Sequence, residues 1–191
     1  SSLILGYGST GKDIERYLIS KNKNYFVYDD KKNINEKFKF NIKNIINLET
    51  IFVSPGIKKD HEILKIAASN GIKILTDIEL FSEFNNVKLI GVTGTNGKTS
   101  FVTLLEKILN EHDIKSKSAG NIGNSPLNLI SDLENLDYLI LELSSFQLNH
   151  LNKLELEIAV VLNIYQDHID WHETFEKYIF SKLKIFNFTT D

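Results

Sequence analysis

The sequence predicts an α/β protein made of two successive units, a Rossmann-like parallel-sheet unit followed by a P-loop ATPase-type unit. Two glycine-rich loops support this prediction, at residues 6–11 and 94–99, and each joins a short apolar strand to a helical pattern. Strands and helices alternate along the rest of the chain, as they do in open parallel sheets. We place the units at residues 1–84 and 85–191, with the junction beginning at Asn85.

The first loop is a complete G-x-G-x-x-G motif that follows a strand predicted at residues 3–5. Its glycines let backbone N–H groups approach a diphosphate at the N-terminus of the next helix. A second strand, at residues 25–28, ends in Asp29, close to the ~20-residue offset at which dinucleotide sites carry an acidic residue for the ribose. The loop recognises phosphate rather than nicotinamide, so NAD and another nucleoside diphosphate fit it equally. A glycine turn without a ligand remains the structural alternative.

The third strand of the first unit, at residues 51–53, ends in the turn Ser54-Pro55-Gly56. Open α/β sheets bind ligands at the carboxyl ends of their strands, although a plain turn in which proline sets φ explains the same residues. The other elements predicted in this unit are an irregular segment at 31–48, helices at 63–67 and 77–84, and a strand at 72–75.

The second loop carries Gly97-Lys98-Thr99 between a strand at residues 87–92 and a helix at 101–109. In a P-loop, backbone N–H groups surround the phosphates, the lysine reaches the β- and γ-phosphates, and the threonine hydroxyl binds Mg²⁺. The general pattern G-x-x-x-x-G-K-[ST] requires glycine where this chain has Val92, so the loop is shorter than usual. The residues expected to contact ATP are Gly94, Thr95, Asn96, Gly97, Lys98, Thr99 and Ser100.

Two further strands end in residues suited to a metal or phosphate site. Glu142 lies near the end of a strand at residues 138–143, where a P-loop protein places a second Mg²⁺ contact. A strand at 158–162 precedes a cluster of histidine and aspartate that includes His168, which favours metal binding or phosphate orientation. We also predict a short strand at 114–118, a loop at 119–124 that is flexible or brings Asn121 toward a ligand, and a helix at 174–188 whose Lys182 is solvated.

Composition excludes several classes of function. The formal net charge of −3 gives no sign of a nucleic-acid or membrane-surface binder. Without cysteine the chain has no disulfides or thiolate sites, so a metal would need oxygen or imidazole ligands. No run approaches the ~18 apolar residues of a membrane span, and we expect a cytoplasmic protein.

Taken together, the motifs resemble those of one family. The loop at 93–99, Thr-Gly-Thr-Asn-Gly-Lys-Thr, is similar to the short ATP loop of the Mur ligases and folylpolyglutamate synthetases, which accounts for Val92. Segments 53–57, 119–123 and 141–148 resemble the Mur ligases that add D-glutamate. The string Leu-Glu-Leu-Ser-Ser-Phe-Gln-Leu at 141–148 is the most discriminating of them, and the resemblance covers essentially the whole chain.

The resemblance implies an ATP-dependent amide ligase of peptidoglycan precursor synthesis. The L-alanyl carboxylate of UDP-N-acetylmuramoyl-L-alanine would attack the γ-phosphate of ATP, and the amine of D-glutamate would then displace phosphate from the acyl phosphate. The implied catalytic residues are Lys98, Glu142, His168 and Lys182. The UDP-substrate would contact Ser9, Thr10, Asp29, Asp30, Lys31, Ser54, Pro55, Gly56, Asn121 and Ser144.

Two Mg²⁺ sites are also implied. Thr99 and Glu142 would bind one ion and His168 would belong to the other. In this family the lysine that matches Lys182 is carbamylated by CO₂, which turns a cation into a carboxylate-like metal ligand. Only a neutral amine reacts with CO₂, so Lys182 would need a lowered pKa.

The family has a third, C-terminal domain that supplies much of the D-glutamate site, and nothing in this chain resembles it. We therefore expect an incomplete central unit and a monomeric N-terminal fragment that retains UDP-substrate binding without ligase turnover. Two alternatives stay open. An NAD-dependent oxidoreductase fits the first loop and Asp29 but leaves Lys98 without a role, and a non-catalytic nucleotide-binding protein would use both units.

Overall fold

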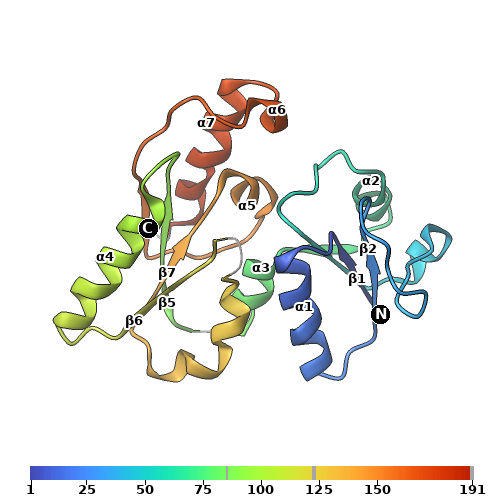
Figure 1. The fold of residues 1–191 in the computed structure, drawn as a ribbon, viewed down its shortest axis with the longest axis horizontal. Coiled ribbons are helices and arrows are strands. Elements are labelled where there is room, and N and C mark those ends of the chain that lie inside the picture. Colours follow the sequence, from blue (N-terminus) through green and yellow to red (C-terminus); the bar gives the residue numbers. More distant parts are fainter. Residues whose placement is uncertain (85, 122–123, 190–191) are drawn as a thin grey trace.

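The computed structural model describes residues 1–84, 86–121 and 124–189 and contains two four-stranded sheets. All of the paired strands are parallel, and the two sheets lie beside each other with helices over their faces (Figure 1). The predicted α/β class is confirmed. The division at residue 85 stays a prediction, because Asn85 lies outside the described residues, as do Ile122 and Gly123 of the predicted loop at 119–124.

The first sheet has the strand order β2-β1-β3-β4. Its strands are β1 (Ser2–Leu5), β2 (Tyr25–Tyr28), β3 (Thr50–Val53) and β4 (Lys73–Leu75), and its helices are α1 (Ser9–Ser20), α2 (Glu62–Ser69) and α3 (Asp77–Ser82). The chain first moves from β1 to β2 and then crosses to the other side of β1 at β3. Such a reversal opens a crevice beyond the carboxyl ends of the two strands, and the loops after β1 and β3 meet there.

The second sheet has the strand order β6-β7-β5-β8. Its strands are β5 (Lys88–Thr93), β6 (Ser116–Ala119), β7 (Tyr138–Glu142) and β8 (Ile158–Val161), and its helices are α4 (Lys98–Glu111), α5 (Ser145–His150), α6 (Ile169–His172) and α7 (Phe175–Leu183). Apart from Lys88, every residue of β5 is buried between β7 and β8. The loop after β5 is therefore flanked by the loops that follow β7 and β8.

Three 3₁₀ helices account for most differences from the predicted elements; they are η1 (Ile42–Asn47), η2 (Pro126–Asn135) and η3 (Lys184–Phe188). The helix predicted at 174–188 is wrong in its second half, where α7 gives way to η3. Ile185 and Phe188 are both buried, and the three-residue period of a 3₁₀ helix places them on one face. The segment 31–48 contains η1 and an isolated bridge between Val27 and Lys39, and the sequence assigned no element to 126–135.

Helix α3 lies at the seam between the two sheets (Figure 1). Thr76 and Glu79 form a capping box at its N-terminus, and Glu79 Oε1 also accepts hydrogen bonds from the backbone N–H groups of Asn152 (2.7 Å) and Lys153 (3.1 Å). One buried apolar cluster runs across the seam; its members include Ile4, Ile14, Val27, Ile78, Phe81, Leu89, Leu139 and Leu148. The two sheets thus share a core. In the described part of the chain, no helix is long and apolar enough to cross a membrane.

Candidate functional site

A cavity of about 670 Å³ opens at the carboxyl ends of β1, β2 and β3. The residues that the sequence assigned to the UDP-substrate line it, except Asn121: they are Ser9, Thr10, Asp29, Asp30, Lys31, Ser54, Pro55, Gly56 and Ser144. Ser144 comes from the second sheet's side, together with Phe146 and Trp171. Both units therefore form the walls, which suits a long ligand held by one unit and processed by the other.

Close packing at two glycines shapes the first loop. Gly6 has a φ of +90°, and a Cβ there would lie 2.8 Å from Cβ of Ser54. A Cβ on Gly11 would overlap the carbonyl oxygen of Gly6, so α1 packs directly against the loop. The hydroxyl of Ser54 donates to the Gly6 carbonyl at 2.7 Å, which joins the loops after β1 and β3 into one floor of the cavity.

Asp29 fixes the rim of the cavity through backbone contacts. Its Oδ2 accepts from the N–H of Tyr7 (2.7 Å), and its Oδ1 accepts from the N–H groups of Lys31 (2.9 Å) and Lys32 (3.0 Å). Burial acts to raise the pKa of Asp29, but these backbone donors outweigh it and hold that pKa below its ordinary value. Asp29 is thus ionised and orders the glycine loop. Asp30 lies beside it, 3.2 Å from Nε2 of His61.

The second loop begins at Gly94 because Val92 is still part of β5. Val92 is fully buried and pairs with Glu142 of β7, so the strand occupies the position at which longer P-loops have their first glycine. Gly97 then caps α4 with a φ of +80°. The N–H groups of the first turn of α4 have no partners within the helix, and they point to the place where a phosphate is expected.

Asn163, which follows β8, fastens this loop in a way that the sequence did not reveal. Its Oδ1 accepts from the N–H groups of Thr95 (3.1 Å) and Asn96 (3.0 Å), and its Nδ2 donates to the Asn96 carbonyl (3.0 Å). These two N–H groups therefore face Asn163. Thr95 is held further by a 2.9 Å hydrogen bond between its hydroxyl and that of Tyr178. The sequence offered one signal for this contact, an asparagine directly after an apolar strand.

Thr99 and Glu142 face each other at the ends of neighbouring elements. The Thr99 hydroxyl donates to both carboxylate oxygens of Glu142, at 3.0 and 3.2 Å, and Asn121 Nδ2 donates to Oε1 at 2.7 Å. Glu142 is only 4% exposed, and no described cationic side chain forms an ion pair with it. A buried carboxylate next to a hydroxyl group supplies oxygen ligands of the kind that Mg²⁺ binds.

Lys98 and Lys182 converge on one carbonyl, that of Gly94, and each Nζ lies 2.8 Å from it. Lys98 also donates to the Thr95 carbonyl at 3.1 Å. Lys182 is only 2% exposed, so the solvated position expected from the helical pattern is wrong; α7 turns this side chain into the loop. Burial, together with the charge of Lys98, lowers the pKa of Lys182 to about 8.

His168 lies in an aromatic cluster, and its Nε2 is 3.6 Å from Oδ2 of Asp167. Its backbone is in the left-handed region (φ 52°, ψ 33°), and its ring lies 4.9 Å from the ring of Phe146. His172 is buried beside it, and its Nε2 lies 3.0 Å from the Ser145 hydroxyl. Burial is the main cause that lowers the pKa of His172. Among the residues that the structure describes, no three histidine or acidic side chains converge on one metal position. The second Mg²⁺ site therefore stays a prediction.

The end of β7 connects the cavity with the P-loop. Glu142 ends the strand and contacts Thr99, whereas Ser144 caps the N-terminus of α5 and lines the cavity. The Ser144 hydroxyl accepts from the N–H of Gln147 at 3.2 Å in a capping box, which fixes the direction of this turn. A ligand in the cavity that reaches Ser144 thus approaches the P-loop.

Comparison with known proteins agrees with this geometry. Residues 92–191 match the family model of the Mur ligase middle domain. The chain is 36% identical to the UDP-N-acetylmuramoylalanine--D-glutamate ligase of Thermosipho africanus, over 95% of this chain and 47% of that protein. Proteins of the same name from Rickettsia bellii and Buchnera aphidicola are each 40% identical, over 96% and 97% of this chain and 42% and 44% of theirs. The chain spans less than half the length of these curated relatives.

Two solved structures share the fold. The UDP-N-acetylmuramate:L-alanyl-gamma-D-glutamyl-meso-diaminopimelate ligase of Neisseria meningitides matches with a TM-score of 0.59 and 14% identity, over 99% of this chain and 68% of that one. The UDP-N-acetylmuramate-alanine ligase of Thermotoga maritima matches with a TM-score of 0.50 and 15% identity, over 99% and 47%. At such identities the likeness concerns the fold alone. Because the family model covers residues 92–191, more than half of the chain, the chain belongs to the Mur ligase family.

Proposed function

We propose that this chain forms the UDP-substrate-binding and ATP-binding parts of a ligase that adds D-glutamate to UDP-N-acetylmuramoyl-L-alanine in peptidoglycan precursor synthesis. The observation that carries the proposal is the continuity at β7, where Glu142 faces the P-loop and Ser144 lines the cavity two residues later. The D-glutamate specificity rests on relatives of that name at 36–40% identity.

In this proposal the UDP end of the substrate occupies the cavity of the first unit. Its diphosphate lies at the N-terminus of α1, near Ser9 and Thr10, and Lys31 supplies a positive charge at the rim. The L-alanyl end extends toward Ser144 and Asn121. The side chain of Asn121 reaches Glu142, so the reacting carboxylate would arrive beside the P-loop.

ATP binds at the loop between β5 and α4. Lys98 leaves the carbonyls of Gly94 and Thr95 and moves to the β- and γ-phosphates, and backbone N–H groups of the first turn of α4 bind phosphate oxygens. Thr99 and Glu142 would hold Mg²⁺, which would neutralise negative charge on the phosphates of ATP. The chain itself thus acts chiefly by positioning and by charge stabilisation.

The reaction has two balanced steps. An oxygen of the L-alanyl carboxylate forms a bond to the γ-phosphorus while the bond to the β,γ-bridging oxygen breaks, which gives an acyl phosphate and ADP. The amine of D-glutamate then attacks the acyl carbon, phosphate leaves, and the nitrogen loses a proton to give the amide. Lys98 stabilises the charge of the transferred phosphoryl group in the first step.

Carbamylation of Lys182 is part of the proposal, as is a second Mg²⁺ near His168. Support for the former comes from the position of a buried amine beside the P-loop, 2.8 Å from the Gly94 carbonyl. A carbamate there would replace a cation by an anion at the edge of the nucleotide site. Growth in ¹³C-labelled bicarbonate should produce a carbamate ¹³C resonance that disappears in Lys182→Arg. A folded protein whose spectrum lacks this resonance would contradict carbamylation of Lys182.

We further propose that the units divide near residue 85, that the chain is monomeric, and that another part of the enzyme supplies much of the D-glutamate site.

The ligand of the cavity in the first unit is tested by calorimetric titration of the chain with UDP-N-acetylmuramoyl-L-alanine in the presence and absence of NADH. Binding of the UDP-substrate without competition is expected. Competitive binding of NADH would instead support the oxidoreductase alternative.

Catalysis is tested with the longer protein that contains this chain. ADP release that requires UDP-N-acetylmuramoyl-L-alanine, with an acyl phosphate trapped by hydroxylamine, is expected, and Lys98→Ala should abolish both. Absence of substrate-dependent ADP release would favour the non-catalytic alternative. Full ligase turnover by the 191 residues alone would contradict the proposal that further parts are needed.

A further inference from the structure

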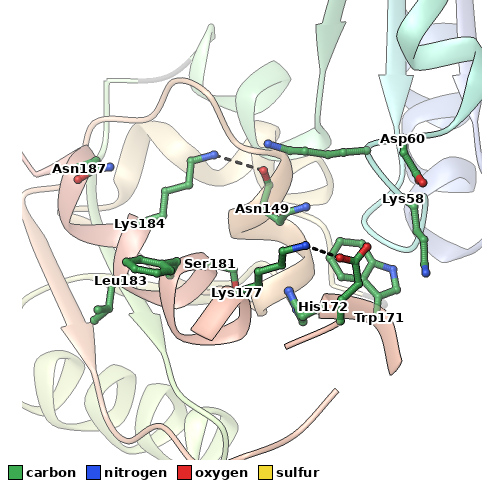
Figure 2. Close-up of a pocket in the computed structure, with 13 residues that line it drawn as sticks. Lys58, Asp60, Asn149, Trp171, His172, Lys177, Ser181, Leu183, Lys184 and Asn187 are labelled. Atoms are coloured by element: carbon green, nitrogen blue, oxygen red, sulfur yellow. Dashed lines mark hydrogen bonds and ion pairs between the residues drawn. The ribbon is translucent and has the colours of Figure 1, made fainter. Parts of the chain in front are cut away.

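A second cleft, of about 790 Å³, lies between the loop before α2 and the outer side of α7 (Figure 2). It shares Lys58, Asp60 and Trp171 with the cavity at the carboxyl ends of β1, β2 and β3, which we call the nucleotide cavity, but it extends away from that cavity along α7. Its charged residues are Lys58, Lys59, Asp60, Glu173, Lys177 and Lys184. The cleft is thus lined by more cations than anions, although the chain as a whole is acidic.

The two acidic side chains compensate these lysines only in part. Glu173 forms an ion pair with Lys177 within the same segment. No carboxylate in the described part of the chain forms an ion pair with Lys59 or Lys184. Asp60 is exposed at the mouth of the cleft. Lys59 and Lys184 therefore lie on the two sides of the cleft without an ion-pair partner in the described structure, although the charge of Glu79 acts on Lys184.

Hydrogen bonds hold the ammonium group of Lys184 and the backbone near Lys59, whereas the Lys59 side chain is exposed in the same cleft. Lys184 Nζ donates to the carbonyls of Asn149 (3.3 Å) and Leu151 at the end of α5, and Figure 2 shows its side chain extending toward Asn149. Lys59 follows Ile57, whose carbonyl is bound by Nε2 of the buried His150.

The charges of Lys59 and Lys184 also affect the pKa of His150. Burial lowers the pKa of His150 to about 4, and the charges of Lys59 and Lys184 both contribute to the lowering. His150 is therefore neutral near pH 7 and tethers the loop without adding a third positive charge. Burial first lowers the pKa of Lys184; the charge of Lys59 lowers it further and that of Glu79 raises it. The cleft as a whole still has more lysines than carboxylates, and a bound anion would offset this positive charge.

We propose that this cleft is a second anion-binding site, separate from the nucleotide cavity, which takes a compact multivalent oxyanion of the phosphate or dicarboxylate class between Lys59 and Lys184. The side-chain amides of Asn149 and Asn187 line the same cleft and provide neutral donors for the remaining oxygens. The openness of the cleft toward Lys58 and Trp171 gives the anion a path from solvent. The proposal does not depend on the ligase function.

The test uses Trp171, the single tryptophan of the chain, as a local fluorescent probe. Inorganic phosphate and succinate are titrated separately into the 191-residue chain at constant ionic strength, with sodium chloride as the balancing salt. Three variants with the same charge change are compared: Lys59→Gln in the cleft, Lys31→Gln in the nucleotide cavity, and Lys43→Gln, an exposed lysine outside both. Circular dichroism confirms that each variant is folded.

A saturable change with at least one of the two anions is expected. Lys59→Gln should weaken that binding roughly ten-fold, since it removes a charge-assisted contact, while Lys31→Gln and Lys43→Gln change it less than about two-fold. The proposal is overturned if neither anion produces a saturable change, or if Lys43→Gln weakens binding as much as Lys59→Gln. A loss confined to Lys31→Gln would assign the signal to the nucleotide cavity and also overturn it.

Discussion

At the scale of single residues, Asn163 determines the shape of the ATP loop. Its side chain makes three hydrogen bonds to the backbone of Thr95 and Asn96. In Asn163→Ala we expect faster amide hydrogen exchange chiefly at Asn96, because the N–H of Thr95 also donates to the backbone carbonyl of residue 163 at 3.1 Å. We also expect a loss of about 1–3 kcal/mol of unfolding free energy and weaker nucleotide binding. Exchange measured by NMR, denaturant unfolding and calorimetric titration of ATP check the three effects.

The matched control for this variant is Asn33→Ala, an exposed asparagine of the first unit with no hydrogen bond to its side chain in the described structure. It should leave the exchange of Thr95 and Asn96 unchanged. If Asn163→Ala leaves the Asn96 amide as protected as in the parent chain, the side-chain hydrogen bonds of Asn163 do not hold the loop.

At the scale of elements, the contact between α1 and the first loop depends on one missing side chain. A Cβ on Gly11 would overlap the Gly6 carbonyl, whereas a Cβ on Gly8 meets no atom within 4 Å. We expect Gly11→Ala to lower the unfolding free energy by about 2 kcal/mol or more. Gly8→Ala should change it by less than about 1 kcal/mol, because lower chain entropy offsets a weaker helix cap. Urea unfolding of both variants measures the contrast; equal effects would show that α1 can shift away from the loop.

The elements that sequence could predict are those with a local signal. Apolar runs that end in glycine predicted β1 and β5, and carboxyl ends of parallel strands meet, so Glu142 and Thr99 could be placed together in advance. The 3₁₀ winding of η3 could not be predicted from the sequence, because it depends on the burial of Ile185 and Phe188 under other elements. The inward position of Lys182 also depends on packing, and so do the Asn163 contacts, which join segments far apart in the sequence.

At the scale of the whole molecule, Asp77 of α3 is a buried acid in the seam between the two units. Its Oδ2 accepts from the Ser125 hydroxyl at 2.6 Å, while Oδ1 has no hydrogen-bond partner in the described structure. Burial raises the pKa of Asp77 from 3.8 to about 6, although Ser125 acts in the opposite direction. The folded state therefore holds a proton on this carboxyl at pH values where the unfolded chain has lost it.

The sign of the pH dependence follows from this raised pKa. The contribution of Asp77 to stability is fully present below about pH 4 and is lost as the pH rises through about 6, an effect of up to about 3 kcal/mol. Because the units share one core across this seam, the loss should appear in a single unfolding transition. In Asp77→Asn the proton is no longer involved, so the stability of the variant relative to the parent should increase between pH 4 and pH 7.5. Urea unfolding at a series of pH values measures this difference, and a difference that does not vary with pH would contradict the assignment.

Ser125→Ala tests the same seam, but its stability relative to the parent should fall as the pH rises. The Ser125 hydroxyl stabilises the ionised form of Asp77, so its removal should raise the pKa of Asp77 further and extend the pH-dependent loss of stability to higher pH. Below about pH 4, where Asp77 is protonated in both states, the variant should lose two neutral hydrogen bonds, the one to Asp77 and the 3.4 Å cap from the N–H of Leu127, at about 1 kcal/mol each. At pH 7.5 the loss should be larger, because a buried carboxylate then has no hydroxyl donor. The stability of Asp77→Asn relative to the parent should rise with pH, and that of Ser125→Ala should fall. These opposite trends would show that ionisation of the Asp77 carboxyl is what destabilises the seam between the units as the pH rises.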